Sequence, residues 1–127
     1  MIFGIGTDLV QVERIEATYR RFGEHFVERL LMPEERALYR PGPRAVRFLA
    51  MRFAAKEAIS KALGTGFRNG VWIRDLGFAP NAWGKPEVIF SARGRAVADR
   101  LGAGEGHVSL TDEAGLVMAF AVLMRKS

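Results

Sequence analysis

Two carboxylates and one ammonium are the groups in this sequence best suited to chemistry. Glu57 and Lys61 lie four residues apart in a run of helix-forming residues, on a stripe that also carries Ser60 and Gly64. The other sides of this helix are mostly apolar, so charged groups on the stripe need partners that offset their desolvation. We interpret the stripe as facing a metal ion and a phosphate. The alternative is an i,i+4 salt bridge on a helix surface, worth about 0.2–0.5 kcal/mol.

The second carboxylate, Asp8, lies near the end of an apolar strand predicted over residues 1–10. Gly4 and Gly6 interrupt this strand, and glycines inside a strand often mark the close approach of another backbone or of a ligand. Two interpretations of Asp8 are open at this point. It binds a ligand, or it caps the helix that follows, since aspartate is a good N-cap residue.

The remaining pattern describes the elements that must position these groups. An amphipathic helix is expected over residues 11–22 and a mostly covered central helix over 44–63. Turn and capping residues predict shorter helices over 26–31, from Pro33, and over 92–101, the last capped by Ser91. Strands are expected at 71–78, 87–90, 107–112 and 116–124, the last two as a hairpin. The sequence therefore predicts an α+β fold, in which a small, mostly antiparallel sheet packs against a long central helix and shorter helices.

Length and composition limit the classes of protein. The 127 residues are enough for one domain, which we expect to span residues 1–127. There is no cysteine, which excludes disulfides and thiolate chemistry. No apolar run is long enough for a membrane span and no signal peptide is evident, so we expect a cytoplasmic protein. The net charge of +5 indicates an anionic partner: a nucleic acid, a phosphorylated small molecule or an acidic protein.

Two motifs about fifty residues apart resemble one known family. They are Gly6-Thr7-Asp8-Leu9-Val10 with Arg14, and Arg52-Phe53-Ala54-Ala55-Lys56-Glu57-Ala58 with Lys61 and Gly64. In this combination the sequence resembles the holo-(acyl-carrier-protein) synthase family, the small bacterial 4′-phosphopantetheinyl transferases. The resemblance continues through Asn81, Gly84, Lys85 and Pro86 and into His107-Val108-Ser109, and it covers essentially the full length.

The resemblance implies an enzyme with this family's fold and reaction. The enzyme would transfer the 4′-phosphopantetheine arm of coenzyme A to a serine of an apo acyl carrier protein and release adenosine 3′,5′-bisphosphate, in support of fatty acid biosynthesis. Carboxylates matching Asp8 and Glu57 would hold Mg²⁺ together with diphosphate oxygens of coenzyme A, which suits the ion's preference for few carboxylates plus substrate phosphates. Lys61 would contact a phosphate oxygen and stabilise or protonate the leaving group. A metal-bound water and Glu57 itself are the two candidates for the base.

The resemblance also implies residues that bind the nucleotide. His107 would bind a nucleotide phosphate, and its alternative is a strand histidine that satisfies local hydrogen bonds. The turn with Asn81, Gly84, Lys85 and Pro86 would surround the adenine and its 3′-phosphate, although such residues also make ordinary turns. Ser60 and Gly64 could approach the diphosphate, or could serve helix packing and termination.

Arginines on the first helix suggest how a carrier protein would dock. Arg14 and Arg21 share one helix face, and with Arg44 they would receive the acidic carrier. The family's homotrimer has active sites between subunits, and the continuously apolar segment 116–124, which should be covered on both faces, is compatible with such packing.

Two other functions are weighed against the enzyme. A nucleic-acid-binding module is disfavoured because the arginines are dispersed and no recognised motif is present. A non-catalytic coenzyme A binder is disfavoured because Asp8, Glu57 and Lys61 occur together.

Overall fold

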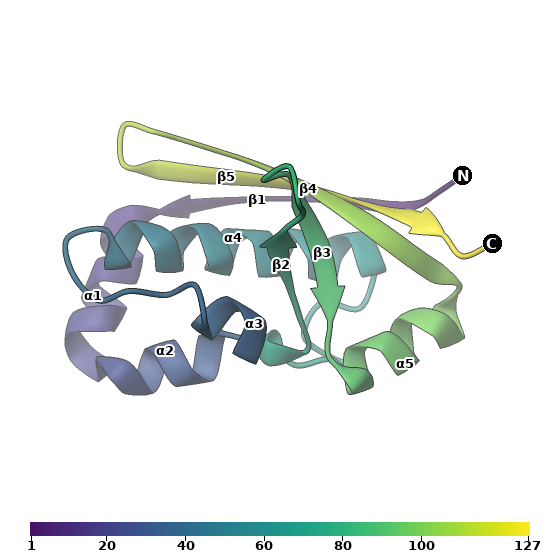
Figure 1. Cartoon of the computed structure of the whole chain (residues 1–127), viewed down its shortest axis with the longest axis horizontal. Coiled ribbons are helices and arrows are strands. Elements are labelled where there is room, and N and C mark those ends of the chain that lie inside the picture. Colours follow the sequence, from purple (N-terminus) through teal and green to yellow (C-terminus); the bar gives the residue numbers. More distant parts are fainter.

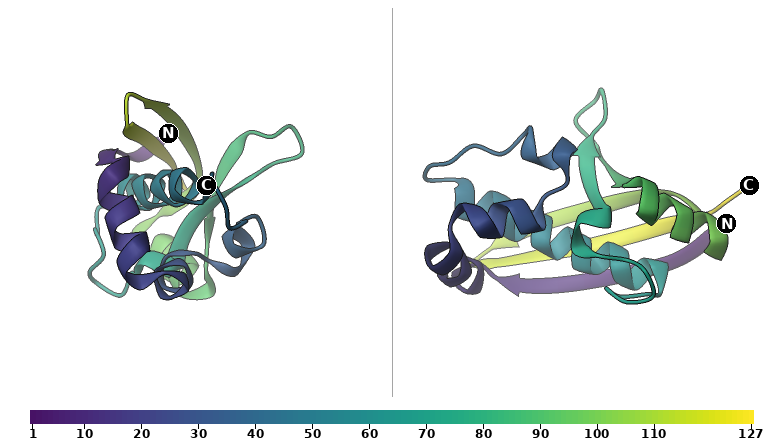
Figure 2. Two further views of the ribbon diagram at one scale, coloured as in Figure 1. Left: turned by 90° about the vertical axis from the view of Figure 1, so that its left-hand side faces the viewer. Right: turned by 90° about the horizontal axis from the view of Figure 1, so that it is seen from below.

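A long helix lies along one face of a five-stranded antiparallel sheet in the computed structural model, which describes all 127 residues (Figure 1). The other helices lie on the same side of the sheet as the long helix (Figures 1 and 2). The elements in chain order are β1 (Ile2–Gln11), α1 (Val12–Phe22), α2 (Glu24–Leu30), α3 (Pro33–Arg36), α4 (Ala45–Leu63), the 3₁₀ turn η1 (Ile73–Asp75), β2 (Leu76–Pro80), β3 (Pro86–Phe90), α5 (Ala92–Leu101), β4 (Ala103–Glu113) and β5 (Leu116–Arg125). The predicted α+β architecture is confirmed.

Helix α4 is the central element of the core. Twelve of its 19 residues are buried, most of them alanine, leucine or isoleucine, as its nearly all-round apolar pattern predicts. The many alanines keep its surface flat, so that β1 and β5 can pack directly against it. The buried apolar side chains form one continuous cluster of 26 residues. None of the helices combines the length and the hydropathy needed to cross a bilayer.

The sheet has the strand order β1-β5-β4-β3-β2, so β1 and β2 are its edges. Strand β1 pairs with β5 alone, from Ile2–Met124 to Gln11–Leu116. On β5 the side chains that face α4 are buried, whereas Met118 and Phe120 on the other face are 44% and 38% exposed. Ile5 and Leu9 of β1 are exposed as well. The chain itself therefore covers only one face of the segment 116–124.

The strand predicted at 71–78 was wrong in its first half. Residues 73–75 form η1, and β2 begins only at Leu76. The cause is local, because the Asp75 carboxylate accepts a hydrogen bond from the backbone N–H of Trp72 at 2.8 Å and turns the chain there. The strand predicted at 107–112 is also longer than expected and begins at Ala103.

Candidate active site

The structure brings Asp8, Glu57 and Lys61 together between β1 and α4. The ammonium Nζ of Lys61 donates to the Asp8 carboxylate oxygen Oδ1 at 3.3 Å and to the Thr7 carbonyl at 2.9 Å. Burial raises the pKa of Glu57; the Asp8 carboxylate raises it further, and the Lys61 ammonium lowers it. Two like charges and one opposite charge therefore face the same small region.

Two glycines set how closely the strand approaches the helix. A Cβ atom placed on Gly6 would lie 2.0 Å from the carbonyl oxygen of Ala58, and one on Gly4 would lie 2.0 Å from that of Ala62. The backbone of β1 thus packs directly on α4, which is one of the roles expected for these glycines. Because side chains alternate along a strand, Asp8 shares the face of Gly4 and Gly6. Gly4 lies against Ala62 and Gly6 against Ala58, so Asp8 lies nearer the middle of α4, where it lines a cavity with Phe53.

Asp8 does not cap the following helix. The N-cap residue of α1 is Gln11, and no side chain forms a cap hydrogen bond there. Asp8 instead lines a cavity of about 180 Å³, whose other walls include Arg14 and Thr18 of α1 and Phe53 of α4. The carboxylate is therefore reached from the arginine-bearing face of α1.

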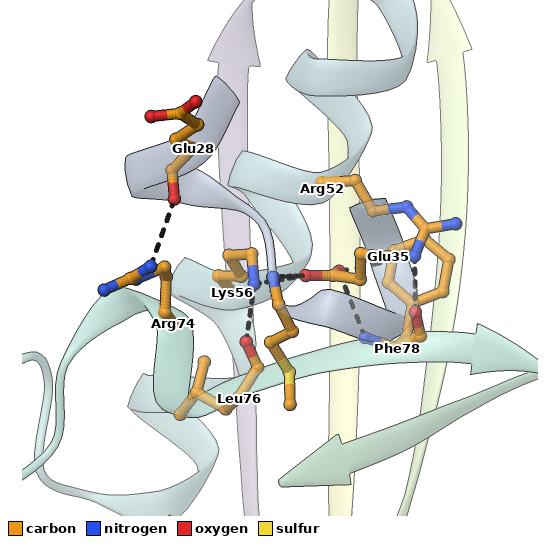
Figure 3. Close-up of polar contacts among 8 residues, drawn as sticks. Glu28, Glu35, Arg52, Lys56, Arg74, Leu76 and Phe78 are labelled. Atoms are coloured by element: carbon orange, nitrogen blue, oxygen red, sulfur yellow. Dashed lines mark hydrogen bonds and ion pairs between the residues drawn. The ribbon is translucent and has the colours of Figure 1, made fainter. Parts of the chain in front are cut away.

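The residue before Glu57 belongs to a buried polar network (Figure 3). The side chains of Lys56 and Glu35 are completely buried, and Lys56 Nζ donates to Glu35 Oε1 at 2.5 Å and to the Leu76 carbonyl at 2.6 Å. Arg52 is also buried; it donates to Glu35 Oε2 at 3.3 Å and to the Phe78 carbonyl. Burial lowers the pKa of Lys56, and the Glu35 carboxylate opposes that shift.

This network fixes α4 relative to β2 and to the segment that starts α3. Glu35 Oε1 also accepts the backbone N–H of Met32 at 3.1 Å. A Cβ on Gly77 would lie 2.6 Å from the Glu35 carboxylate, so a glycine leaves the room for this acid. The sequence analysis did not predict this network. The one indication in the sequence was that Lys56 lies among apolar residues of the central helix, where a lysine needs a buried partner.

A second group of predicted residues meets at another cavity. Lys85, Pro86 and His107 line it together with Ser109 and Phe120, and its volume is about 430 Å³. The Nδ1 atom of His107 is buried and has no hydrogen-bond partner. The alternative prediction was that His107 satisfies local hydrogen bonds. Its Nδ1 atom forms no hydrogen bond within the chain, so this alternative does not hold for that atom.

The other predicted nucleotide-binding residues mainly shape the backbone. Asn81 Oδ1 accepts the backbone N–H groups of Trp83 and Lys85 at 2.8 and 3.0 Å, and Gly84 has a φ of 84°, which favours glycine. Ser60 is buried and its hydroxyl donates to the Glu57 carbonyl, while Gly64 ends α4 in the left-handed region. Contact of these four residues with coenzyme A stays a prediction.

The two groups of residues lie on opposite faces of the sheet. Asp8 pairs with Ala119, and His107 pairs with Val122. Positions 119 and 122 of β5 point to opposite faces because side chains alternate along a strand. Ala119 is fully buried on the face toward α4, so the His107 cavity opens on the face away from α4. One chain alone does not place both groups around a common space.

The three arginines predicted to receive the carrier protein are all exposed to solvent. Arg14 and Arg21 lie on α1, Arg44 precedes α4, and all three are exposed. None of them takes part in an ion pair within the chain, whereas Arg20 of α1 pairs with Glu16 at 3.4 Å. The unpaired arginines of α1 therefore share the helix face of Arg14, which lines the Asp8 cavity.

The carboxylate pair fits a metal ion that takes most of its ligands from elsewhere. No group of three or more histidine, aspartate or glutamate side chains in this chain could hold a metal by itself. Mg²⁺ commonly uses one or two carboxylates, with substrate phosphates and water completing an octahedron. Asp8 and Glu57 suit such an ion, and their mutual repulsion would be relieved by it.

Comparisons with known proteins agree along the whole chain. The model of the 4′-phosphopantetheinyl transferase superfamily matches residues 4–121. The holo-[acyl-carrier-protein] synthase of Halorhodospira halophila is 49% identical over 126 residues, which is 98% of both chains. That of Neisseria meningitidis is 43% identical over 122 residues, covering 96% of this chain and 98% of the relative.

Solved structures give the same result. The crystal structure of the Neisseria meningitidis synthase superposes with a TM-score of 0.90 at 40% identity, covering 98% of this chain and 100% of that one. The Helicobacter pylori synthase in complex with coenzyme A gives a TM-score of 0.81 at 30% identity, covering 94% and 98% of the two chains. The Plasmodium yoelii acyl carrier protein synthase with ADP bound gives 0.86 at 28% identity, covering 100% and 97%. Two carboxylates and a lysine meeting between β1 and α4, in a chain so similar to these relatives, place it in the holo-(acyl-carrier-protein) synthase family of the 4′-phosphopantetheinyl transferase superfamily.

Proposed function

We propose that this protein transfers the 4′-phosphopantetheine arm of coenzyme A to a serine of apo acyl carrier protein and releases adenosine 3′,5′-bisphosphate. The observation that carries the proposal is the meeting of Asp8, Glu57 and Lys61 in a chain of this family. The named relatives are holo-[acyl-carrier-protein] synthases, and one of them is in complex with coenzyme A. The continuous core supports one domain over residues 1–127, and the lack of cysteine supports a cytoplasmic location.

The reaction is a phosphoryl transfer. The serine hydroxyl oxygen attacks the phosphorus that bears the pantetheine, and the bond from that phosphorus to the bridging diphosphate oxygen breaks. The leaving group is adenosine 3′,5′-bisphosphate, and the serine proton is the one proton that must move. The protein's part in such a reaction is to position the reactants and to offset negative charge.

Each of the three residues has a role in that task. Asp8 and Glu57 would hold Mg²⁺, which when bound would neutralise diphosphate oxygens and the charge that develops on the leaving bisphosphate. Lys61 reaches the same region with its Nζ and can donate a hydrogen bond to a phosphate oxygen. Glu57 and a water molecule held by the bound ion are the two candidates that would accept the serine proton.

Mass spectrometry of an apo carrier protein tests the proposal. After incubation with this protein, coenzyme A and Mg²⁺, the carrier should gain the mass of one phosphopantetheine arm. A carrier whose acceptor serine is changed to alanine should not, and a chelator should abolish the gain. An unmodified carrier under these conditions would contradict the proposal. Calorimetry with coenzyme A, with and without Mg²⁺, then separates a non-catalytic binder from a nucleic-acid module, which would be indifferent to both.

Docking of the carrier on α1 predicts a selective effect of charge reversal. Arg14→Glu should raise the KM for the carrier by about 10-fold or more, because the acidic partner now meets a carboxylate beside the Asp8 cavity. The affinity for coenzyme A, measured by calorimetry, should be unchanged. Arg100→Glu, the same charge change near the end of α5, is the matched control and should leave both constants unaltered. Equal loss of carrier and coenzyme A binding in Arg14→Glu would refute the docking role.

The proposal includes a homotrimer whose active sites lie between subunits. Support comes from the opposite placement of the Asp8 and His107 groups and from the exposed apolar face of β1 and β5. A neighbouring copy could present its His107 cavity beside the carboxylate pair, and so complete the site. A particle of about three times 14.1 kDa is expected by sedimentation.

Mixing variants tests whether the site is shared. Asp8→Ala and His107→Ala should each be nearly inactive, yet co-refolding equal amounts should restore about a quarter of the activity, because one interface in four pairs two intact halves. Asp8→Ala mixed with Glu57→Ala is the control. It should restore nothing, since both acids belong to the same half. No recovery in the first mixture would place the whole site within one chain.

A further inference from the structure

A cavity with three arginines in its walls lies among the helices, apart from the residues assigned above to the transfer reaction. Its volume is about 400 Å³, and its walls come from α2, from η1 with the residue before it, and from α5. The 3₁₀ turn η1 packs against both α2 and α5, which brings the three segments together. We call this space the arginine cavity, and its charged and aromatic lining residues are His25, Glu28, Arg29, Trp72, Arg74 and Arg93.

The positive charge of the arginine cavity is not matched by acids of the chain that face it. The side chain of Arg29 forms no ion pair or hydrogen bond within the chain. Arg74 donates only to the backbone carbonyl of Glu28, at 3.4 Å, and the Glu28 carboxylate points away from Arg74 (Figure 3). An anion supplied by a partner would therefore offset the repulsion among these guanidinium groups.

Arg93 is held in position before any partner arrives. Its Nε donates to the Asp75 carboxylate oxygen Oδ2 at 2.9 Å, and its guanidinium lies 5.4 Å from the centre of a Trp72 ring. Asp75 is buried and also accepts the Ser91 hydroxyl at 2.8 Å, so this carboxylate is fixed. The two terminal amino groups of Arg93 form no bond within the chain, and 57% of its side chain is exposed. An arginine fork oriented in this way loses little entropy when it binds a carboxylate.

Shared walls connect the arginine cavity to the Asp8 cavity. An apolar cavity of about 320 Å³ lies between them, where α1 meets α2. Thr18 is common to this cavity and the Asp8 cavity, and His25 and Arg29 are common to it and the arginine cavity. The three cavities form a track along α1 and α2, from the candidate active site to α5. A folded partner with its acceptor group at Asp8 can lie along the whole track, whereas a small molecule fills one cavity only.

We propose that the arginine cavity binds acidic side chains of the carrier protein, at a distance from its acceptor serine. This rests on the proposed function, and it extends the carrier contact from α1 to η1 and α5, with Arg74 and Arg93 as the new contact residues. Carboxylates fit the forked donors of arginine, and charges at the rim of an interface govern the rate and orientation of docking. A nucleic acid is disfavoured because the middle cavity of the track is apolar, whereas a phosphate backbone needs positive charge along its length.

Charge reversal at Arg74 tests the proposal without disturbing the buried Asp75. Arg74→Glu should raise the KM for the carrier by about 5-fold or more, and this difference should shrink at high salt. The kcat at saturating carrier, the affinity for coenzyme A and the unfolding midpoint should be unchanged. Arg100→Glu, on the same helix as Arg93 but outside the cavity, is the control and should keep the original KM. An unchanged KM in Arg74→Glu overturns the inference and leaves the proposed function standing. If the unaltered protein transfers nothing, the proposed function itself fails.

Two further measurements identify what occupies the cavity. The chain has two tryptophans, so in Trp83→Phe the emission of Trp72 alone reports on the cavity wall. An apo carrier without tryptophan should change this emission over the concentrations at which calorimetry detects carrier binding. Among carrier variants with one acid changed to lysine, at least one should restore a low KM with Arg74→Glu, because the exchanged charges attract again. Carrier binding without a change in emission overturns the inference, as does a change that inorganic phosphate produces and the carrier does not.

Discussion

Replacing either Asp8 or Glu57 with alanine should reduce transfer of the phosphopantetheine arm by about 10³-fold or more. Each substitution removes one of only two carboxylates that the chain offers to a divalent cation in this region. A phosphoryl transfer depends on groups that offset charge, and no third acid is in place to substitute. The rate is measured by mass spectrometry of the carrier protein, over a range of Mg²⁺ concentrations.

Both variants should remain folded. The pKa of Glu57 is raised by burial and by Asp8, which means that ionising this carboxyl costs more free energy in the folded protein than in the unfolded chain. Removing either acid therefore relieves repulsion and should not lower the unfolding midpoint. Asp99→Ala, which removes an exposed acid paired with Lys126, is the matched control and should keep full activity. Near-normal transfer by Asp8→Ala or Glu57→Ala at low Mg²⁺ would show that the metal assignment is wrong.

Lys56→Met should lower the free energy of unfolding by about 3–5 kcal/mol. The methionine fills a similar volume, but it leaves the fully buried Glu35 carboxylate with one cation fewer and the Leu76 carbonyl without its donor. An uncompensated buried charge is expensive in a low-dielectric interior. Urea unfolding at a fixed protein concentration measures the effect, since assembly would make the midpoint depend on concentration.

The same substitution at an exposed ion pair provides the comparison. Lys126 contacts Asp99 at 3.0 Å, and about half of its side chain surface is exposed. Lys126→Met should change the free energy of unfolding by less than about 1 kcal/mol. Equal effects of the two substitutions would mean that the Lys56–Glu35 contact does not hold α4 in place.

Local features of the sequence were sufficient to predict much of the fold. Gly4 and Gly6 indicated a close backbone approach, and the apolar surroundings of Glu57 indicated a covered helix; both are found. These predictions work because they depend on residues near one another in the chain. Ser91 caps α5 as expected, by accepting the backbone N–H of Gly94 at 3.0 Å.

The predictions that failed or were missing depend on distant contacts. The sequence assigns no contact to Glu35 or Arg52, yet both side chains are buried together with that of Lys56. Nothing near Glu35 in the sequence shows that β2 will deliver two carbonyls and an N–H group beside it. The opposite placement of Asp8 and His107 likewise follows only from the pairing of β5 with both of its neighbours.

The edge position of β1 has a consequence for the order of folding. The hydrogen-bond partners of Glu35 all come from residues 32–78, so the contacts that join α4 to β2 and α3 involve no residue of β5. Strand β1 forms its backbone hydrogen bonds with β5 alone, which lies at the far end of the sequence. Pairing the two strands closes a loop of about a hundred residues, which has an entropic cost. During synthesis on a ribosome, β1 can therefore pair, and hold Asp8 opposite Glu57, only after residues 116–125 have emerged.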